Sequence, residues 1–222
     1  MPAVLVEPIS NTPLTQPTTQ STNYHPTPSK VSYADFLEML PVEGMIAEWK
    51  DGEVILMPVN FMHNDLGVFL MRLFDIFITH HNLGKLFYEP FLLKTGNDMP
   101  ARMPDFMFVA NENLGIREKA HLSGSPDLIV EIVSPESVGR DYGEKFGEYE
   151  QIGVKEYWII DPLRKKSYFY VLAEDGYFDQ RLPDSEGVYH SKVLEGFWIN
   201  INWLWQETFP KHVEIQKMWK IS

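Results

Sequence analysis

The sequence predicts one mixed α/β domain in which helices flank a mixed central sheet. Three observations support this fold class. Apolar residues recur at helical spacing across residues 63–81, several short runs rich in aromatic and branched side chains follow, and a second helical pattern separates the last two runs. With 222 residues and 44% hydrophobic content, the chain can bury one sizeable core.

The charge and the cysteine content exclude several classes of protein. A formal net charge of −12 disfavours a broad basic face for nucleic acid, so any such contact must be local. The absence of cysteine excludes disulfides, thiolate metal sites and thiol catalysis, and it fits a reducing compartment. The sequence shows neither a signal peptide at its start nor a later apolar run of membrane-spanning length. We therefore expect a cytoplasmic protein without membrane segments.

The first thirty residues differ in composition from the rest of the chain. Residues 1–30 are rich in Pro, Thr, Ser, Gln and Asn, and almost no large apolar side chain follows Val6. Such a segment cannot build a core, so we expect a flexible leader. The alternative is an ordered arm that lies on a partner subunit, with Tyr24 and the prolines at 26–28 packed in extended form.

The domain begins with a short helix and a hairpin. Ser32 precedes an apolar pattern at residues 34–40, which predicts an N-capped helix that ends before Pro41. Residues 46–57 alternate around the turn Asp51-Gly52, a strong hairpin signal. The long helix over residues 63–81 follows, with Asn60 available as its cap.

The second half of the domain predicts most of the sheet. Residues 86–93, 106–109 and 128–133 are expected strands, a helix follows over residues 140–152, and residues 156–160 form another strand. Residues 168–172 and two weaker strands form a meander that extends the sheet. The apolar segment 198–205 is expected to pack back on the core. These elements define a domain over residues 31–207 and a C-terminal tail over residues 208–222.

Two acids interrupt apolar strands. Glu131 lies within the aliphatic run 128–133, and Asp105 precedes the run 106–109. Continuous apolar runs belong to strands covered on both faces, so Glu131 is expected to be buried. Burying an unpaired carboxylate costs several kcal/mol, which calls for a cation, a partner or a raised pKa. Neighbouring strands bring side chains to about 5 Å, close enough for two carboxylates to share Mg²⁺ or Mn²⁺.

Lys145 is the third member of this expected site. It falls within the apolar stripe of the helix 140–152, whereas Glu144 and Glu148 fall outside it. From there its ammonium can reach back toward the acids and stabilise charge that develops on a phosphate. The alternative is a lysine that extends along the stripe to keep its charge in water.

Other polar residues are weaker candidates. His63 shares the inward face of the long helix and could lie near the acids, or it could cap or pack. Glu48 could supply a further acid, although a solvated hairpin charge is slightly favoured. Asp127 suits a strand entry better than a ligand. His80 and His81 suit a helix C-terminus, and the sequence supplies no spaced partners for zinc.

The chain also resembles a known family. The residues that carry the resemblance are EWKDGE at 48–53, HN at 63–64, MPD at 103–105, PDLIVEIVSP at 126–135, DYGEK at 141–145 and GVKEYWIIDP at 153–162. In this order they resemble the Uma-two family of restriction-endonuclease-like proteins, within the PD-(D/E)XK nuclease superfamily. The resemblance implies a restriction-endonuclease-like core. It also implies an ion held by Asp105, Glu131 and the backbone carbonyl of Ile132.

The general nuclease motif places a lysine two residues after its acid, where this chain has Val133. The narrower family carries the lysine on the following helix, at the position that Lys145 matches. The resemblance therefore implies a Mg²⁺- or Mn²⁺-dependent endonuclease that acts on DNA, expected as a homodimer. One alternative is a non-catalytic dimeric scaffold on a nuclease fold, which the negative charge favours. Another is a sugar hydrolase with paired carboxylates, which needs neither metal nor lysine.

Overall fold

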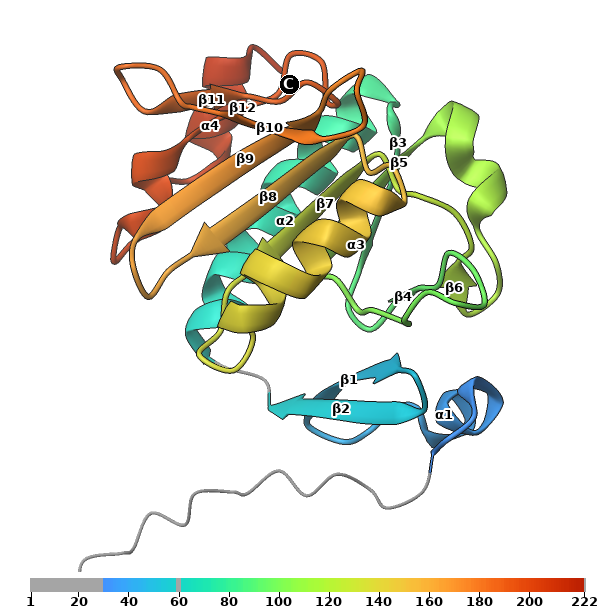
Figure 1. Cartoon of the computed structure of the whole chain (residues 1–222). Helices are drawn as coiled ribbons and strands as arrows, with labels where there is room; N and C mark the ends of the chain where they lie inside the picture. The colour runs from blue at the N-terminus through green and yellow to red at the C-terminus, as the bar shows by residue number, and fades with distance from the viewer. Residues whose placement is uncertain (1–29, 59–60, 222) are drawn as a thin grey trace, which may run out of the picture.

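A six-stranded mixed sheet forms the centre of the protein in the computed structural model, which describes residues 30–58 and 61–221 (Figure 1). The strand order is β10-β9-β8-β7-β5-β3. The bounds are β3 Gly84–Tyr88, β5 Phe106–Ala110, β7 Leu128–Ile132, β8 Glu156–Asp161, β9 Lys166–Leu172 and β10 Phe178–Arg181. The predicted fold class, a mixed sheet flanked by helices with an added antiparallel meander, is confirmed.

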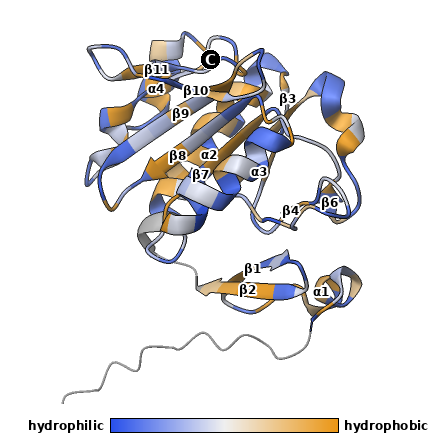
Figure 2. Cartoon of the chain, in the orientation of Figure 1, coloured by the Kyte–Doolittle hydropathy of each residue, from blue (hydrophilic) through white to orange (hydrophobic). Residues whose placement is uncertain are grey.

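The two central strands are parallel, and all the other neighbours in this sheet are antiparallel. β7 and β8 run in the same direction and every one of their residues is buried. Helices cover both faces of this pair, which explains the near-continuous apolar sequence of both strands. Figure 2 shows hydrophobic residues concentrated on these central strands.

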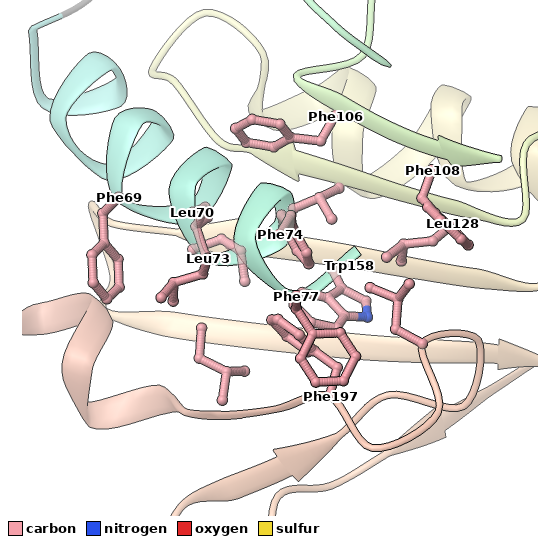
Figure 3. Packing of buried hydrophobic residues seen from close by; sticks show 14 of the residues in the cluster. Phe69, Leu70, Leu73, Phe74, Phe77, Phe106, Phe108, Leu128, Trp158 and Phe197 are labelled. Carbon is pink, nitrogen blue, oxygen red and sulfur yellow. The ribbon is translucent and has the colours of Figure 1, made fainter. Parts of the chain in front are cut away.

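One face of the sheet packs on the long helix α2, Phe61–His81. Leu70, Leu73, Phe74 and Phe77 of this helix are almost fully buried, and Figure 3 shows them facing Trp158 and other side chains of the sheet. Phe74 lies 5.5 Å from Trp158 between ring centroids. The 3.6-residue repeat of α2 therefore supplies one wall of the core.

The other face of the sheet packs on α3, Lys145–Gln151 (Figure 1). A short π-helical segment, η2, Arg140–Glu144, leads directly into α3. Tyr149 of α3 packs with Met107, Ile129 and Tyr157 of the strands in a second cluster of buried residues. The side chains of Asp105 and Glu131 belong to this α3 side, because residues two apart on a strand share a face.

The N-terminal elements form a smaller layer beside the sheet. Helix α1, Tyr33–Met39, is capped by Ser32, as predicted. Strands β1, Met45–Lys50, and β2, Glu53–Pro58, form the predicted hairpin, with positive φ at Asp51 and Gly52. A third cluster that includes Phe36 and Ala101 joins these elements to the domain. The remaining early elements are β4 Leu92–Leu93, η1 Asn111–Ile116 and β6 His121–Leu122.

Two expectations differ from the structure. The strand expected over residues 86–93 is divided into β3 and β4 by a turn at Glu89-Pro90, because proline lacks the N–H that a continuous ladder needs. The last weak strand does not extend the central sheet: β11, Val188–His190, pairs instead with β12, Trp198–Asn200. Asn60 and residues 1–29 of the predicted leader lie outside the described residues.

The predicted C-terminal tail, which the structure describes over residues 208–221, packs against the core. Its helix α4, His212–Trp219, buries Ile215 and Trp219 in the same cluster as α2. The 3₁₀ turn η3, Ile201–Trp205, precedes it and buries Leu204, so the segment 198–205 does return to the core. The packed core thus extends past residue 207. No helix in the described part of the chain is long and apolar enough to cross a membrane.

Candidate functional site

Asp105 and Glu131 lie side by side where β5 and β7 meet. Phe106 pairs with Val130 in this antiparallel ladder, so the next pair along the two strands is Asp105 and Glu131. The Asp105 side chain crosses to β7, where its Oδ2 accepts a hydrogen bond of 2.5 Å from the backbone N–H of Ile132. Asp105 is 7% exposed and Glu131 is 3% exposed. The structure thus brings together the two acids singled out from the sequence.

Lys145, the first residue of α3, reaches into this pair from the helix layer. Its Nζ lies 3.0 Å from Glu131 Oε1, 3.3 Å from Glu48 Oε1 and 3.1 Å from Asp141 Oδ1. The side chain is buried and does not extend to water. Burial lowers the pKa of Lys145, but the three carboxylates outweigh burial and raise this pKa well above its usual value. Lys145 therefore carries a positive charge at neutral pH.

Glu131 is held from two sides. Its Oε1 accepts hydrogen bonds from Lys145 Nζ at 3.0 Å and from the Tyr149 hydroxyl at 2.6 Å. Burial raises the pKa of Glu131 well above its usual range, and the nearby carboxylates add to the rise. The Lys145 charge and the Tyr149 hydrogen bond oppose this rise without cancelling it. The charges around Glu131 therefore do not fully compensate the burial of its carboxylate, and a further cation would stabilise the ionised form.

Glu48 is a full member of the cluster. The slightly favoured interpretation of a solvated hairpin charge is wrong, because the Glu48 side chain is completely buried. The hairpin β1-β2 packs over the sheet end, and Glu48 accepts hydrogen bonds from Arg102 Nη1 at 3.0 Å and from the Met103 N–H at 3.3 Å. Burial raises its pKa, but Lys145, Arg102 and these hydrogen bonds lower it overall.

Arg102 was missed in the sequence, although it organises the outer part of the cluster. It is 1% exposed and binds Glu148 through two hydrogen bonds of 2.7 Å, from Nε and from Nη2. The same side chain bonds Glu48, so it links the hairpin to α3. A charged residue between Ala101 and Met103 is the same energetic anomaly that identified Glu131. The same criterion could have found it.

Asp141 was also missed as a site residue. It lies in η2, four residues before Lys145, and it is 1% exposed. The Ser137 hydroxyl donates to Asp141 Oδ2, while Oδ1 faces the Lys145 ammonium. Tyr157 donates to the Asp141 backbone carbonyl at 3.0 Å. Its spacing of four from Lys145 on one helical face was the available signal.

Two cavities adjoin these residues. The first, about 30 Å³ in volume, is lined by Asp105, Glu131, Ile132 and Lys145 among others. The second, about 230 Å³, lies on the α2 side and shares Glu89, Asp105 and Ile132 with the first. Glu89 follows β3 directly opposite Asp105 in the β3-β5 register. The acidic pair therefore stands at the junction of a small cavity and a larger one.

The remaining candidates are placed elsewhere or lie outside the described side chains. His63 falls in the first turns of α2, where the structure describes the backbone and not this side chain. Asp127 lies at the opposite end of β7. There it accepts hydrogen bonds from the Ala110 N–H and Asn113 and pairs with Lys155, a structural set of partners. His80 and His81 end α2, as predicted.

The donor set at the junction fits a divalent metal ion. Oxygen ligands suit Mg²⁺ and Mn²⁺, and a cavity needs only about 10–15 Å³ to hold a water-sized group. Among the described residues, no three acidic or histidine side chains converge as a metal cage. Two carboxylates leave positions for further oxygen ligands, water or substrate, as Mg²⁺ commonly requires.

The charge balance favours a cation too. This cluster contains four buried carboxylates, those of Glu48, Asp105, Glu131 and Asp141. It contains two buried cationic side chains, those of Arg102 and Lys145. A buried excess of negative charge is costly unless a cation or a proton compensates it. With every carboxylate ionised, the excess is two negative charges, which equals in size the charge of one divalent cation.

Comparisons with known proteins give a family and a related fold. A family model described as "Uma2: Putative restriction endonuclease" matches residues 33–202. A solved structure, that of a "putative nuclease belonging to DUF820" from Anabaena variabilis ATCC 29413, resembles this chain with a TM-score of 0.62 and 17% identity. The similarity covers 77% of this chain and 95% of that one, and it shows a shared fold. A search among curated proteins found no match.

Proposed function

We propose that this chain, which belongs to the Uma2 family of putative restriction endonucleases, is a metal-dependent nuclease that hydrolyses phosphodiester bonds in DNA. One observation carries the proposal. Asp105, Glu131 and Lys145 line one small cavity, and Lys145 Nζ lies 3.0 Å from Glu131 Oε1. Two carboxylates beside a buried ammonium suit an ion that meets a phosphate, and we propose Mg²⁺ or Mn²⁺ as that ion.

The ligands of this ion would be Asp105, Glu131 and the backbone carbonyl of Ile132. When bound there, the ion would polarise a phosphate oxygen and lower the pKa of a bound water. The protein holds both acids in place, because the Ile132 N–H fixes Asp105 and the Tyr149 hydroxyl fixes Glu131. Such fixed ligands spare the site the cost of ordering them during the reaction.

Lys145 would act through its charge. Its pKa is raised well above the usual value by the surrounding carboxylates, so at neutral pH it cannot accept a proton from water. A fixed ammonium instead stabilises negative charge that develops on the phosphoryl oxygens. Glu48 contacts Lys145 and would position it, whereas a role for His63 remains a prediction.

Incubation with plasmid and with single-stranded DNA tests the proposal. We expect cleavage with Mg²⁺ or Mn²⁺, inhibition by chelation, and a loss of activity on the order of 10²-fold or more in Glu131→Ala. Glu174→Ala is a matched control because Glu174 is exposed and remote from the cluster. Unchanged activity in Glu131→Ala would overturn the assignment.

A scaffold without catalysis is the second candidate, and the net charge of −12 favours it because that charge repels polyanions. Calorimetric titration with Mn²⁺ separates the two. A nuclease site should bind Mn²⁺ in a manner that Asp105→Asn abolishes, while a scaffold should show no such dependence. The expected homodimer can be checked on the same samples by light scattering.

A further inference from the structure

The larger cavity beside Asp105 has the composition of a site for a flat, mostly apolar group. Phe106, Ile132, Val68 and Met71 give it apolar walls, and Asn64 and Glu89 add polar groups. Tyr88 also lines it and is 51% exposed. Aromatic and apolar walls with a few polar groups are typical of pockets that bind rings.

The size of this cavity restricts its occupant. Its volume of about 230 Å³ falls below the range of about 300–1,000 Å³ that is common for drug-sized ligands. One planar ring system fits this space better than a whole nucleotide. The phosphate and the sugar would then remain outside it, toward the shared residues Asp105 and Ile132.

The surrounding charge points to stacking in preference to phosphate contacts. Lys145 is the one cationic side chain among the described residues that line the two cavities, and the chain is acidic as a whole. Affinity for a DNA strand at these two cavities must therefore come largely from the base. Stacking on an aromatic ring supplies such affinity without regard to sequence.

We propose that this cavity receives one unpaired nucleobase of a DNA strand whose adjacent phosphate meets Asp105 and Glu131. The substrate is then single-stranded or locally unpaired DNA, because a base within a relaxed duplex cannot leave the stack without cost. Tyr88 offers a ring for stacking, and Asn64 offers hydrogen bonds to the base edge. This inference rests on the proposed nuclease function for its substrate, but its binding test is independent of cleavage.

Gly67 of α2 gives a way to close the cavity. A Cβ added at Gly67 would lie 3.8 Å from Ile132 Cδ1 and 4.0 Å from Phe106 Cζ, which is ordinary contact. Gly67→Leu therefore fills the cavity, and leucine is also a better helix former than glycine. Gly147→Leu makes the same change on an exposed position of α3 with nothing within 4 Å of the added Cβ, so it is the matched control.

The test compares two DNA strands by fluorescence anisotropy with Ca²⁺ present. One is a short oligothymidylate, and the other is an abasic strand of the same length that keeps every phosphate. We expect the wild type and Gly147→Leu to bind the first strand about 5-fold to 100-fold more tightly. Gly67→Leu should lose most of this difference. Tyr88→Ala should also lose it, whereas Tyr88→Phe should keep it. Because Tyr88 is 51% exposed, neither substitution should impair folding.

Equal affinities of the wild type for both strands, or no binding of either, would overturn the proposal. A difference that survives in both Gly67→Leu and Tyr88→Ala would overturn it as well. Cleavage is measured separately with Mg²⁺ or Mn²⁺, where a single strand should be cut faster than the matched duplex. Base-dependent binding without cleavage would refute the nuclease function and support the base site. Cleavage without base-dependent binding would support the nuclease function and refute the base site.

Discussion

Lys145 Nζ lies 3.0 Å from Glu131 Oε1, and the two side chains are 4% exposed each. This pair joins the helix layer to the central strand at the point where the small cavity opens. Because Glu48 and Asp141 also contact the ammonium, Lys145 pairs with three carboxylates at once. Its removal should therefore affect folding as well as any reaction.

Lys145→Met should lower the free energy of unfolding by about 3–5 kcal/mol, because it leaves buried carboxylates without their cation. Urea denaturation at neutral pH measures this loss. Lys166→Met is the control, since Lys166 is exposed on β9 and should change stability by no more than about 0.5 kcal/mol. A loss of the same small size in both variants would contradict the charge balance described here.

Arg102→Lys should be destabilising even though the charge is kept. The guanidinium binds both oxygens of Glu148 at 2.7 Å and Glu48 at 3.0 Å, and an ammonium cannot reproduce these contacts together. We expect a loss of about 1–3 kcal/mol, the cost of leaving buried polar atoms unsatisfied. Urea denaturation gives the value, with Arg181→Lys as the control because Arg181 is exposed. Equal stability of Arg102→Lys and wild type would show that geometry is unimportant at this position.

Affinity for Mn²⁺ should rise with pH. Burial raises the pKa of Glu131 well above its usual range, so without metal this carboxyl retains its proton to a higher pH than an exposed glutamate. The ion must displace that proton, and binding should weaken as pH falls below the folded pKa. Calorimetry in buffers of different ionisation enthalpy should detect proton release on binding. Glu131→Gln should show weak binding without proton release, whereas release that persists in this variant would point to another group.

Local pattern was enough to predict most of the fold and the inner part of the site. The apolar runs and the helical stripe of α2 follow directly from side-chain periodicity, and burial cost alone identified Glu131. Lys145 was found because it lies on an apolar helix face, and the structure places it against the acid as expected. Each of these inferences concerns residues within one element or two neighbouring elements.

Contacts between elements that are distant in the sequence were harder to predict. Glu48 is buried because the hairpin packs over the sheet end, and its partner Arg102 is 54 residues away, so neither sequence neighbourhood indicates the pair. The turn at Glu89-Pro90 was hidden within an apolar run that resembles one strand. The C-terminal helix α4 was underestimated because it is only eight residues long, although it buries Ile215 and Trp219.

The last prediction concerns Asp161, which ends β8 and accepts a hydrogen bond from Tyr142 of η2. Burial raises its pKa, but hydrogen bonds from Arg164 and from the Tyr142 hydroxyl outweigh burial and lower the pKa below its usual value. A carboxylate with a lowered folded pKa stabilises the protein above its unfolded pKa of about 3.9, and this contribution is lost as pH falls through the folded value.

Asp161→Asn should therefore be less stable than the wild type at pH 7, by about 1 kcal/mol. The difference should shrink as the pH falls below about 4, because the wild-type carboxylate is then protonated. Urea denaturation across this pH range measures both quantities, with Asp175→Asn as the exposed control. A gap between Asp161→Asn and wild type that stays constant down to acid pH would show that Asp161 acts through packing and not through its charge.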